Sequence, residues 1–154
     1  MSLHEDIRVR VLTVEYDQIV HLLRTEIILT PEFVAHPVQA SFIAIWDTGA
    51  TNTVISQQVI AALHLVPSGI VEVMTASGAR QSYTYSIAMT LANKVHFPSL
   101  RATEGNISGG DVLIGMDVIS QGDFAVTNAH GTTTYSFRVP SLEHIDFGQP
   151  HEHP

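Results

Sequence analysis

Short runs in which apolar and polar residues alternate make up most of this chain, and a period of two constrains such runs to β-strands. The clearest run ends at Asp47, with apolar side chains on every second position at Val38, Ala40, Phe42, Ala44 and Trp46. Other candidate strands are bounded by Gly, Pro and Asn. One precedes this run, at residues 26–29, and the rest come after it, at residues 71–74, 81–91, 95–102, 112–114, 125–127 and 132–139. The sequence therefore predicts an all-β protein.

Three local patterns refine this prediction. An N-terminal strand is expected to have Ile7, Val9 and Val11 on one face and Arg8 and Arg10 on the other. A hairpin is expected around residues 75–79, between the strands at 71–74 and 81–91. Ser56 is a suitable N-cap for a short helix over residues 57–63, and a second short helix is expected over residues 116–121.

The length of 154 residues suits one domain, with a core over about residues 5–140 and a polar tail at 141–154. With 45% hydrophobic and 14% charged residues, the chain is globular rather than disordered. Its net charge is -8, and it has no cluster of Lys or Arg beyond Arg8 and Arg10, so nucleic acid is excluded as an expected partner. No window approaches the ~20 apolar residues of a membrane span.

The chain contains no cysteine, which excludes disulfides, thiol nucleophiles and Cys-ligated zinc. The N-terminal residues lack an apolar stretch of signal-peptide length. Both observations fit a reducing compartment, and we expect a cytoplasmic location.

The segment 45–55 carries the strongest chemical signal. An apolar strand runs into Asp47-Thr48-Gly49-Ala50, and a Thr-Val-Ile strand follows. An Asp-Thr-Gly triplet alone arises by chance in about one of 30 chains of this size. The longer pattern, followed at a distance by Asp111-Val112-Leu113-Ile114-Gly115-Met116-Asp117, is much more specific. No other Asp in the chain precedes Thr-Gly or Ser-Gly.

These elements, in this order and with a Thr-Ala-Ser-Gly hairpin between them, resemble the retropepsin-like aspartic proteases over about residues 38–139. The pattern is especially similar to the single-lobed cellular and bacterial members. The resemblance implies a small closed β-barrel with a ψ-shaped loop arrangement and one or two short helices. It also implies aspartic-type endopeptidase activity on peptide or protein substrates, without a cofactor.

The resemblance assigns roles to individual residues. The catalytic loop comprises Asp47 as the catalytic carboxylate, Thr48 as the hydroxyl that bonds across two subunits, and Gly49. The substrate-binding residues implied are Ala50, Thr51 and Asn52, with a flap tip of Thr75, Ala76, Ser77 and Gly78. The structural residues implied are Leu113, Ile114 and Gly115, which pack across the catalytic loop, and Asp117, which braces Thr53.

Three departures from the viral pattern stand out. Thr51 and Asn52 replace an acidic pair that binds the substrate main chain, and Met116 replaces an Arg that ties the viral dimer. The flap reads Thr-Ala-Ser-Gly-Ala rather than a Gly-rich run. None of these departures affects the catalytic carboxylate.

The chemistry requires a second carboxyl group. Without a metal or a protein nucleophile, the attacking species is a water, so one group must accept its proton while an acid polarises the scissile carbonyl. Because the chain offers one such Asp, a two-fold homodimer must bring two copies of Asp47 together. Two carboxyls held close cannot both ionise readily, and the aspartic protease dyad is itself the established case of a pair that shares one proton.

Two alternatives stay open. One is a catalytically silent dimer of the same fold that binds peptide or protein ends. The other is a processing domain dedicated to one larger partner. The histidines His144, His151 and His153, with Asp146, lie in the polar tail, where a solvated segment is expected rather than a metal site. No zinc-protease, nucleophile-elbow or nucleotide-binding motif is found in the sequence.

Overall fold

The structure is a computed structural model, and it describes residues 8–148. Its elements in chain order are β1 (Arg10–Glu15), β2 (Arg24–Pro31), β3 (Ala40–Trp46), β4 (Val54–Ile55), α1 (Gln57–Ala62), β5 (Gly69–Thr75), β6 (Gly78–Leu91), β7 (His96–Glu104), β8 (Val112–Ile114), α2 (Met116–Ile119), β9 (Asp123–Thr127), η1 (Ala129–Gly131) and β10 (Thr134–Val139).

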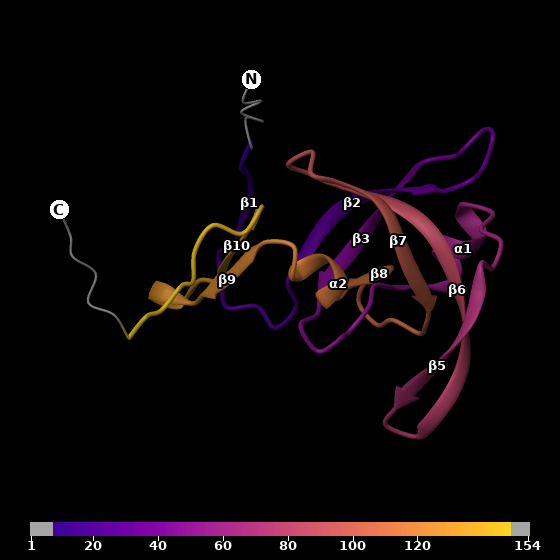
Figure 1. Ribbon diagram of the computed structural model, residues 1–154. Coiled ribbons are helices and arrows are strands. Elements are labelled where there is room, and N and C mark those ends of the chain that lie inside the picture. Colours follow the sequence, from indigo (N-terminus) through magenta and orange to yellow (C-terminus); the bar gives the residue numbers. More distant parts are fainter. Residues whose placement is uncertain (1–7, 149–154) are drawn as a thin grey trace.

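Six strands form a closed barrel in the order β2-β3-β8-β4-β7-β6, and β6 closes it by pairing with β2 (Figure 1). Closure leaves no unpaired barrel edge. The helices α1 and α2 are short, and no helix within the described residues is long and apolar enough to cross a membrane. The predicted small closed barrel with short helices is confirmed.

Helix α1 begins where the sequence predicts it. The Ser56 hydroxyl accepts a hydrogen bond from the amide of Val59, so it caps one of the free amides of the first turn. Val59 and Leu63 point into the core. The helix covers one side of the barrel from this position.

The strand β8 lies between β3 and β4, parallel to β3 and antiparallel to β4. The segment 47–53 connects β3 to β4, so β8 separates the two strands that this loop joins. The chain therefore returns, more than sixty residues later, directly against the loop that carries Asp47.

A second, three-stranded sheet has the order β1-β10-β9 and packs against one end of the barrel (Figure 1). Its inner face carries Phe124, Tyr135 and Phe137, and these rings surround Trp46 at centroid distances of 5.0, 6.0 and 4.9 Å. Trp46 is buried, as are Tyr135 and Phe137. This aromatic cluster anchors the end of β3, one residue before Asp47.

The first strand is Arg10–Glu15, and its buried face is not the one that carries Val11. Leu12 is buried, whereas Val11 is 54% exposed and Val9 is 42% exposed, and Ile7 lies outside the described residues. The register pairs Leu12 with Phe137, which places Leu12 on the aromatic cluster. Val11 pairs with Arg138 on the outer face.

The predicted hairpin around residues 75–79 is confirmed, and its strands are longer than expected. The strands β5 and β6 pair from Gly69 and Thr84 to Thr75 and Gly78, with a two-residue turn between them. Gly78 has a φ of 115°, a value that favours glycine. Figure 1 shows this hairpin projecting beyond the barrel.

Asp123 ties the segment after β10 to the three-stranded sheet. Its carboxylate accepts hydrogen bonds from the Leu142 amide at 2.9 Å, the Ser141 hydroxyl and the Arg138 guanidinium. These donors, the Leu142 amide first, lower the pKa of Asp123 well below its usual range. The charged carboxylate therefore stabilises the attachment of this segment.

We expect this attachment to persist throughout the neutral and mildly acidic range. A lowered folded-state pKa contributes stability above the ordinary carboxyl value of about 3.9, and this contribution is lost as the pH falls through the lowered value. Hydrogen exchange at the Leu142 amide, corrected for the intrinsic rate, should therefore show constant protection from about pH 8 to 5. Asp123→Ala, which removes the acceptor, should remove this protection at every pH, whereas Asp17→Ala on an exposed loop should preserve it. Equal protection in the two variants would contradict the prediction.

Candidate active site

The loop 47–53 holds Asp47 by backbone hydrogen bonds on both sides. The Asp47 amide donates to the carbonyl of Ile114 at 3.0 Å, and the Ala50 amide donates to the carbonyl of Asp47 at 3.2 Å. The Gly49 amide donates to Asp47 Oδ1 at 2.8 Å. The carboxylate is therefore fixed through one oxygen, and Asp47 Oδ2 accepts no hydrogen bond from the described residues.

The alternation of β3 directs Asp47 away from the barrel core. Trp46 faces the aromatic cluster, while Ile43 and Ile45 lie on the same face as Asp47. Ile45 is buried, Ile43 is exposed and Asp47 is half-buried. The carboxylate thus lies at the surface beside apolar side chains, as the sequence indicates.

Gly115 lies directly against the loop 47–53. The next two residues bond to the loop. The Met116 amide donates to the carbonyl of Ala50 at 2.8 Å, and the Asp117 amide donates to the carbonyl of Thr51 at 3.1 Å. A Cβ atom at Gly115 would lie 2.6 Å from the carbonyl carbon and oxygen of Asn52. Glycine is required here for close approach of two backbones, since its φ of -92° is open to any residue.

Asp117 binds the far end of the same loop. Its carboxylate accepts hydrogen bonds from the Thr53 amide and the Thr53 hydroxyl, both at 3.0 Å, and from the Val118 amide at 3.1 Å. Thr53 is fully buried, and its carbonyl accepts from the Thr103 amide at 2.9 Å. The segment after β8 therefore fixes both Ala50 and Thr53, which shapes the loop from within one chain.

Thr53→Val should destabilise the fold by about 1–2 kcal/mol, because Val keeps the volume but removes one hydrogen bond to a carboxylate. Asp117 retains its bonds from the backbone amides of Thr53 and Val118. Urea unfolding measures the change, and Thr51→Val on the exposed part of the loop is the matched control. Equal midpoints for the two variants would show that the buried hydroxyl contributes nothing.

The hairpin tip predicted as a flap stays apart from this loop in the single chain. Thr75, Ala76, Ser77 and Gly78 are all exposed. The side-chain hydrogen bonds of the tip stay within it, since the Thr75 hydroxyl bonds the Ser77 hydroxyl at 3.0 Å and the carbonyl of Gly78 at 2.9 Å. The structure therefore brings Asp47, Gly115 and Asp117 together, but it does not bring the tip against them.

Sequence reasoning missed Arg24, and it gave no role to Asp111, the first residue of the motif 111–117. The Arg24 Nε donates to the carbonyl of Gly109 at 2.9 Å, and Asp111 Oδ2 accepts from the amide of Ile43 at 3.0 Å. Both contacts fix the segment 105–111, which leads into β8. In the sequence, the Gly109-Gly110 pair indicates that another part of the chain approaches this backbone closely. No residue near the pair in the sequence identifies Arg24 as that neighbour.

No metal centre is formed by the described residues: they contain no group of three or more His, Cys, Asp or Glu side chains that could hold an ion. Of the histidines considered above, His151 and His153 lie outside residues 8–148. His144 and Asp146 are exposed.

A solved structure with a similar fold is described as a retropepsin-like aspartic protease from Rickettsia conorii. The TM-score is 0.52 at 10% sequence identity, and the match covers 86% of this chain and 95% of that chain. This likeness supports the barrel fold.

Two further solved structures are more distant. The simian foamy virus (mac) protease has a TM-score of 0.46 at 14% identity, covering 64% of this chain and 92% of that chain. The retroviral protease-like domain of Ddi1 from Leishmania major has a TM-score of 0.42 at 17% identity, and the match covers 77% of this chain and 94% of that chain. No curated protein matches the chain.

The family comparison covers the site described above. A model of the family described as gag-polyprotein putative aspartyl protease matches residues 38–121, which is more than half of the chain. The matched segment includes the loop 47–53, the hairpin β5–β6 and the segment 111–117. The chain belongs to the gag-polyprotein putative aspartyl protease family.

Proposed function

We propose that this protein is a homodimeric aspartic endopeptidase in which two copies of Asp47, one per chain, form the catalytic pair. The observation that carries the proposal is the fixed position of the Asp47 carboxylate. One oxygen accepts from Gly49, the other has no partner among the described residues, and the side chain faces away from the core. A carboxylate held in this way at the surface can meet a second copy of itself.

The proposed chemistry uses one proton shared by the two carboxyls, because two adjacent carboxylates cannot both ionise readily. The ionised member accepts a proton from the attacking water, whose oxygen bonds to the scissile carbonyl carbon. The protonated member donates its proton to the carbonyl oxygen. The carboxyl that took the water proton then donates a proton to the amide nitrogen, while the other carboxylate accepts a proton from a hydroxyl of the tetrahedral intermediate. The carbon–nitrogen bond breaks to yield a carboxylic acid and an amine, and the pair again holds one proton.

The remaining loop residues fit a role at the dimer centre. Thr48 is exposed, and its hydroxyl bonds to no described residue, so it is free to bond the loop of a partner. We assign substrate binding to Ala50, Thr51 and Asn52 and to the tip of the hairpin β5–β6. This tip would close over an extended peptide and offer it main-chain hydrogen bonds.

We expect a two-fold dimer in solution whose interface includes residues 47–53 of both chains. Such an interface typically buries on the order of 1,600 Å² in total. Light scattering at tens of micromolar protein, with and without peptide, measures the mass. A monomer under all these conditions would contradict the proposal, because a single Asp47 cannot supply both the acid and the base.

Cleavage profiling tests the activity itself. Wild-type protein should cleave members of a proteome-derived peptide library between about pH 4 and 7, and EDTA and thiol reagents should leave the cleavage unchanged. Cleavage of a single protein, with almost no library member cut, would indicate a processing domain. A dimer that binds library peptides without cutting any would indicate the silent binding module.

A further inference from the structure

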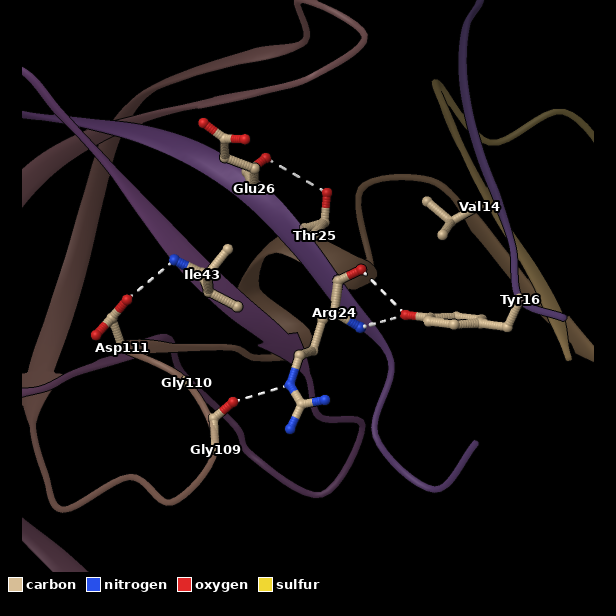
Figure 2. Close-up of a pocket in the computed structure, with 9 residues that line it drawn as sticks. All are labelled: Val14, Tyr16, Arg24, Thr25, Glu26, Ile43, Gly109, Gly110 and Asp111. Atoms are coloured by element: carbon tan, nitrogen blue, oxygen red, sulfur yellow. Dashed lines mark hydrogen bonds between the residues drawn. The ribbon is translucent and has the colours of Figure 1, made fainter. Parts of the chain in front are cut away.

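A cavity of about 570 Å³ opens on the outer face of the barrel, in the corner between β1, β2 and the segment 109–111 (Figure 2). Val14 and Tyr16 form one wall, and Thr25 and Ile43 form the opposite wall. Figure 2 shows Arg24 at the base of this space, between the Tyr16 ring and Gly109. The lining thus combines apolar walls with one cation, Arg24, and two carboxylates, Glu26 and Asp111.

The guanidinium of Arg24 is exposed, and one hydrogen bond through its Nε orients it. Its Nε donates to the carbonyl of Gly109 at 2.9 Å, and its backbone amide donates to the Tyr16 hydroxyl at 2.9 Å. A Cβ atom at Gly109 would lie 3.1 Å from the Arg24 Nη2, so the glycine leaves room for the guanidinium to approach. The two terminal nitrogens are left free to bind a ligand.

No carboxylate within residues 8–148 forms an ion pair with Arg24. Both ion pairs among residues 8–148 belong to Arg138, although the chain has 15 acidic and 7 basic side chains. Figure 2 shows the Glu26 carboxylate pointing away from the guanidinium, and Asp111 accepts the amide of Ile43. A guanidinium oriented in this way beside apolar walls is suited to a carboxylate, which it can bind through two parallel hydrogen bonds.

The cavity lies on the same face of β3 as the catalytic carboxylate. Ile43 precedes Asp47 by four residues, and both follow the outward alternation of that strand. At about 3.3 Å per residue, the separation along the strand is about 13 Å. An extended substrate that runs along β3 from Asp47 covers a similar length per residue, and it would reach the cavity about four residues from the scissile bond.

We propose that this cavity is a substrate subsite that binds an acidic side chain, Asp or Glu, about four residues from the scissile bond, with Arg24 as its specificity-determining residue. The inference rests on the proposed function, and it names the substrate class of that site. In a two-fold dimer each chain presents one copy of the cavity. The preferred substrate therefore carries acidic residues on both sides of the bond that is cut.

The test measures binding, so that it does not depend on cleavage. The full-length Asp47→Asn variant is titrated into three pools of fluorescein-labelled dodecapeptides with a randomised apolar centre. The pools differ only in having Glu, Gln or Lys at the fourth residue on each side of the centre. Fluorescence anisotropy should show that the Glu pool binds about a hundredfold more tightly than the Gln pool, as expected for two charge-assisted contacts, one in each copy of the cavity, at about tenfold each.

Variants at Arg24 separate two effects of this residue: recognition of the substrate charge, and positioning of the segment 105–111 through the Gly109 carbonyl. Arg24→Gln removes the charge but keeps a donor for the Gly109 carbonyl, and it should abolish the preference for Glu. Arg24→Lys keeps the charge without the planar fork and should retain part of the preference. Arg101→Met, at an exposed arginine on β7 that does not line the cavity, should bind as the parent does.

Equal binding of the three pools, a preference for Lys, or a preference for Glu that persists in Arg24→Gln would overturn the inference. Its failure is distinguishable from failure of the proposed function. If wild-type protein cuts peptides without any preference for Glu at these positions, the endopeptidase proposal is supported and the subsite proposal is wrong. If Arg24-dependent binding is found but wild-type protein cuts no peptide, the cavity is a binding site for acidic peptides and the endopeptidase proposal is wrong.

Discussion

Replacement of Asp47 by Asn is expected to reduce peptide cleavage by about 10³-fold or more, because the amide can neither accept the proton of the attacking water nor donate an acidic proton. Asn has nearly the same shape, and its side-chain oxygen can still accept the Gly49 amide that Asp47 Oδ1 accepts. The fold and the dimer should therefore persist. Initial rates on a peptide selected by profiling measure the effect, together with circular dichroism and light scattering.

The matched control is Asp17→Asn, which removes one carboxylate from an exposed loop and should leave the rate unchanged. Cleavage by Asp47→Asn at the wild-type rate would exclude Asp47 from the chemistry. Loss of wild-type activity in EDTA would assign the chemistry to a metal instead. Either result would remove the catalytic pair, while the family and the fold would remain.

Gly115→Ala is expected to destabilise the fold by about 3 kcal/mol and to abolish cleavage. The added methyl group would lie 2.6 Å from two backbone atoms of Asn52 and 2.9 Å from the carbonyl of Ala50. Backbone cannot rotate away as a flexible side chain does, so the loop 47–53 or α2 must shift. A shift of the loop moves the Asp47 carboxylate away from the partner copy, and misplacement by about 1 Å is sufficient to impair catalysis.

Urea unfolding and peptide cleavage measure the two effects of Gly115→Ala. Ser120→Ala, at the exposed C-cap of α2, is the matched control, because it changes one small residue of the same helix without any contact to the loop. Wild-type stability in Gly115→Ala would mean that the two backbones are farther apart than the structure indicates. Full stability with full activity would remove Gly115 from the support of the site.

Much of the site was predictable because its signals are local. The Asp-Thr-Gly-Ala turn follows a strand that alternates apolar and polar residues, so its position at a strand end can be read from the sequence. The capping of α1 by Ser56 and the hairpin that turns before Gly78 have equally local causes. Their structures depend on residues within a few positions of each other.

The sequence by itself determined the strands, the turns and the identity of the Asp loop, while the tertiary structure decided which segments meet. Local pattern places neither Gly115 against Asn52 nor Asp117 on Thr53, which only the family resemblance implied, and nothing in the sequence indicated Arg24 beside Gly109, because each contact joins segments more than sixty residues apart. The burial of Leu12 rather than Val11 likewise follows from the pairing of β1 with β10 at the opposite end of the chain. A period of two gives each strand two faces, and only the register of its partner decides which of them is buried.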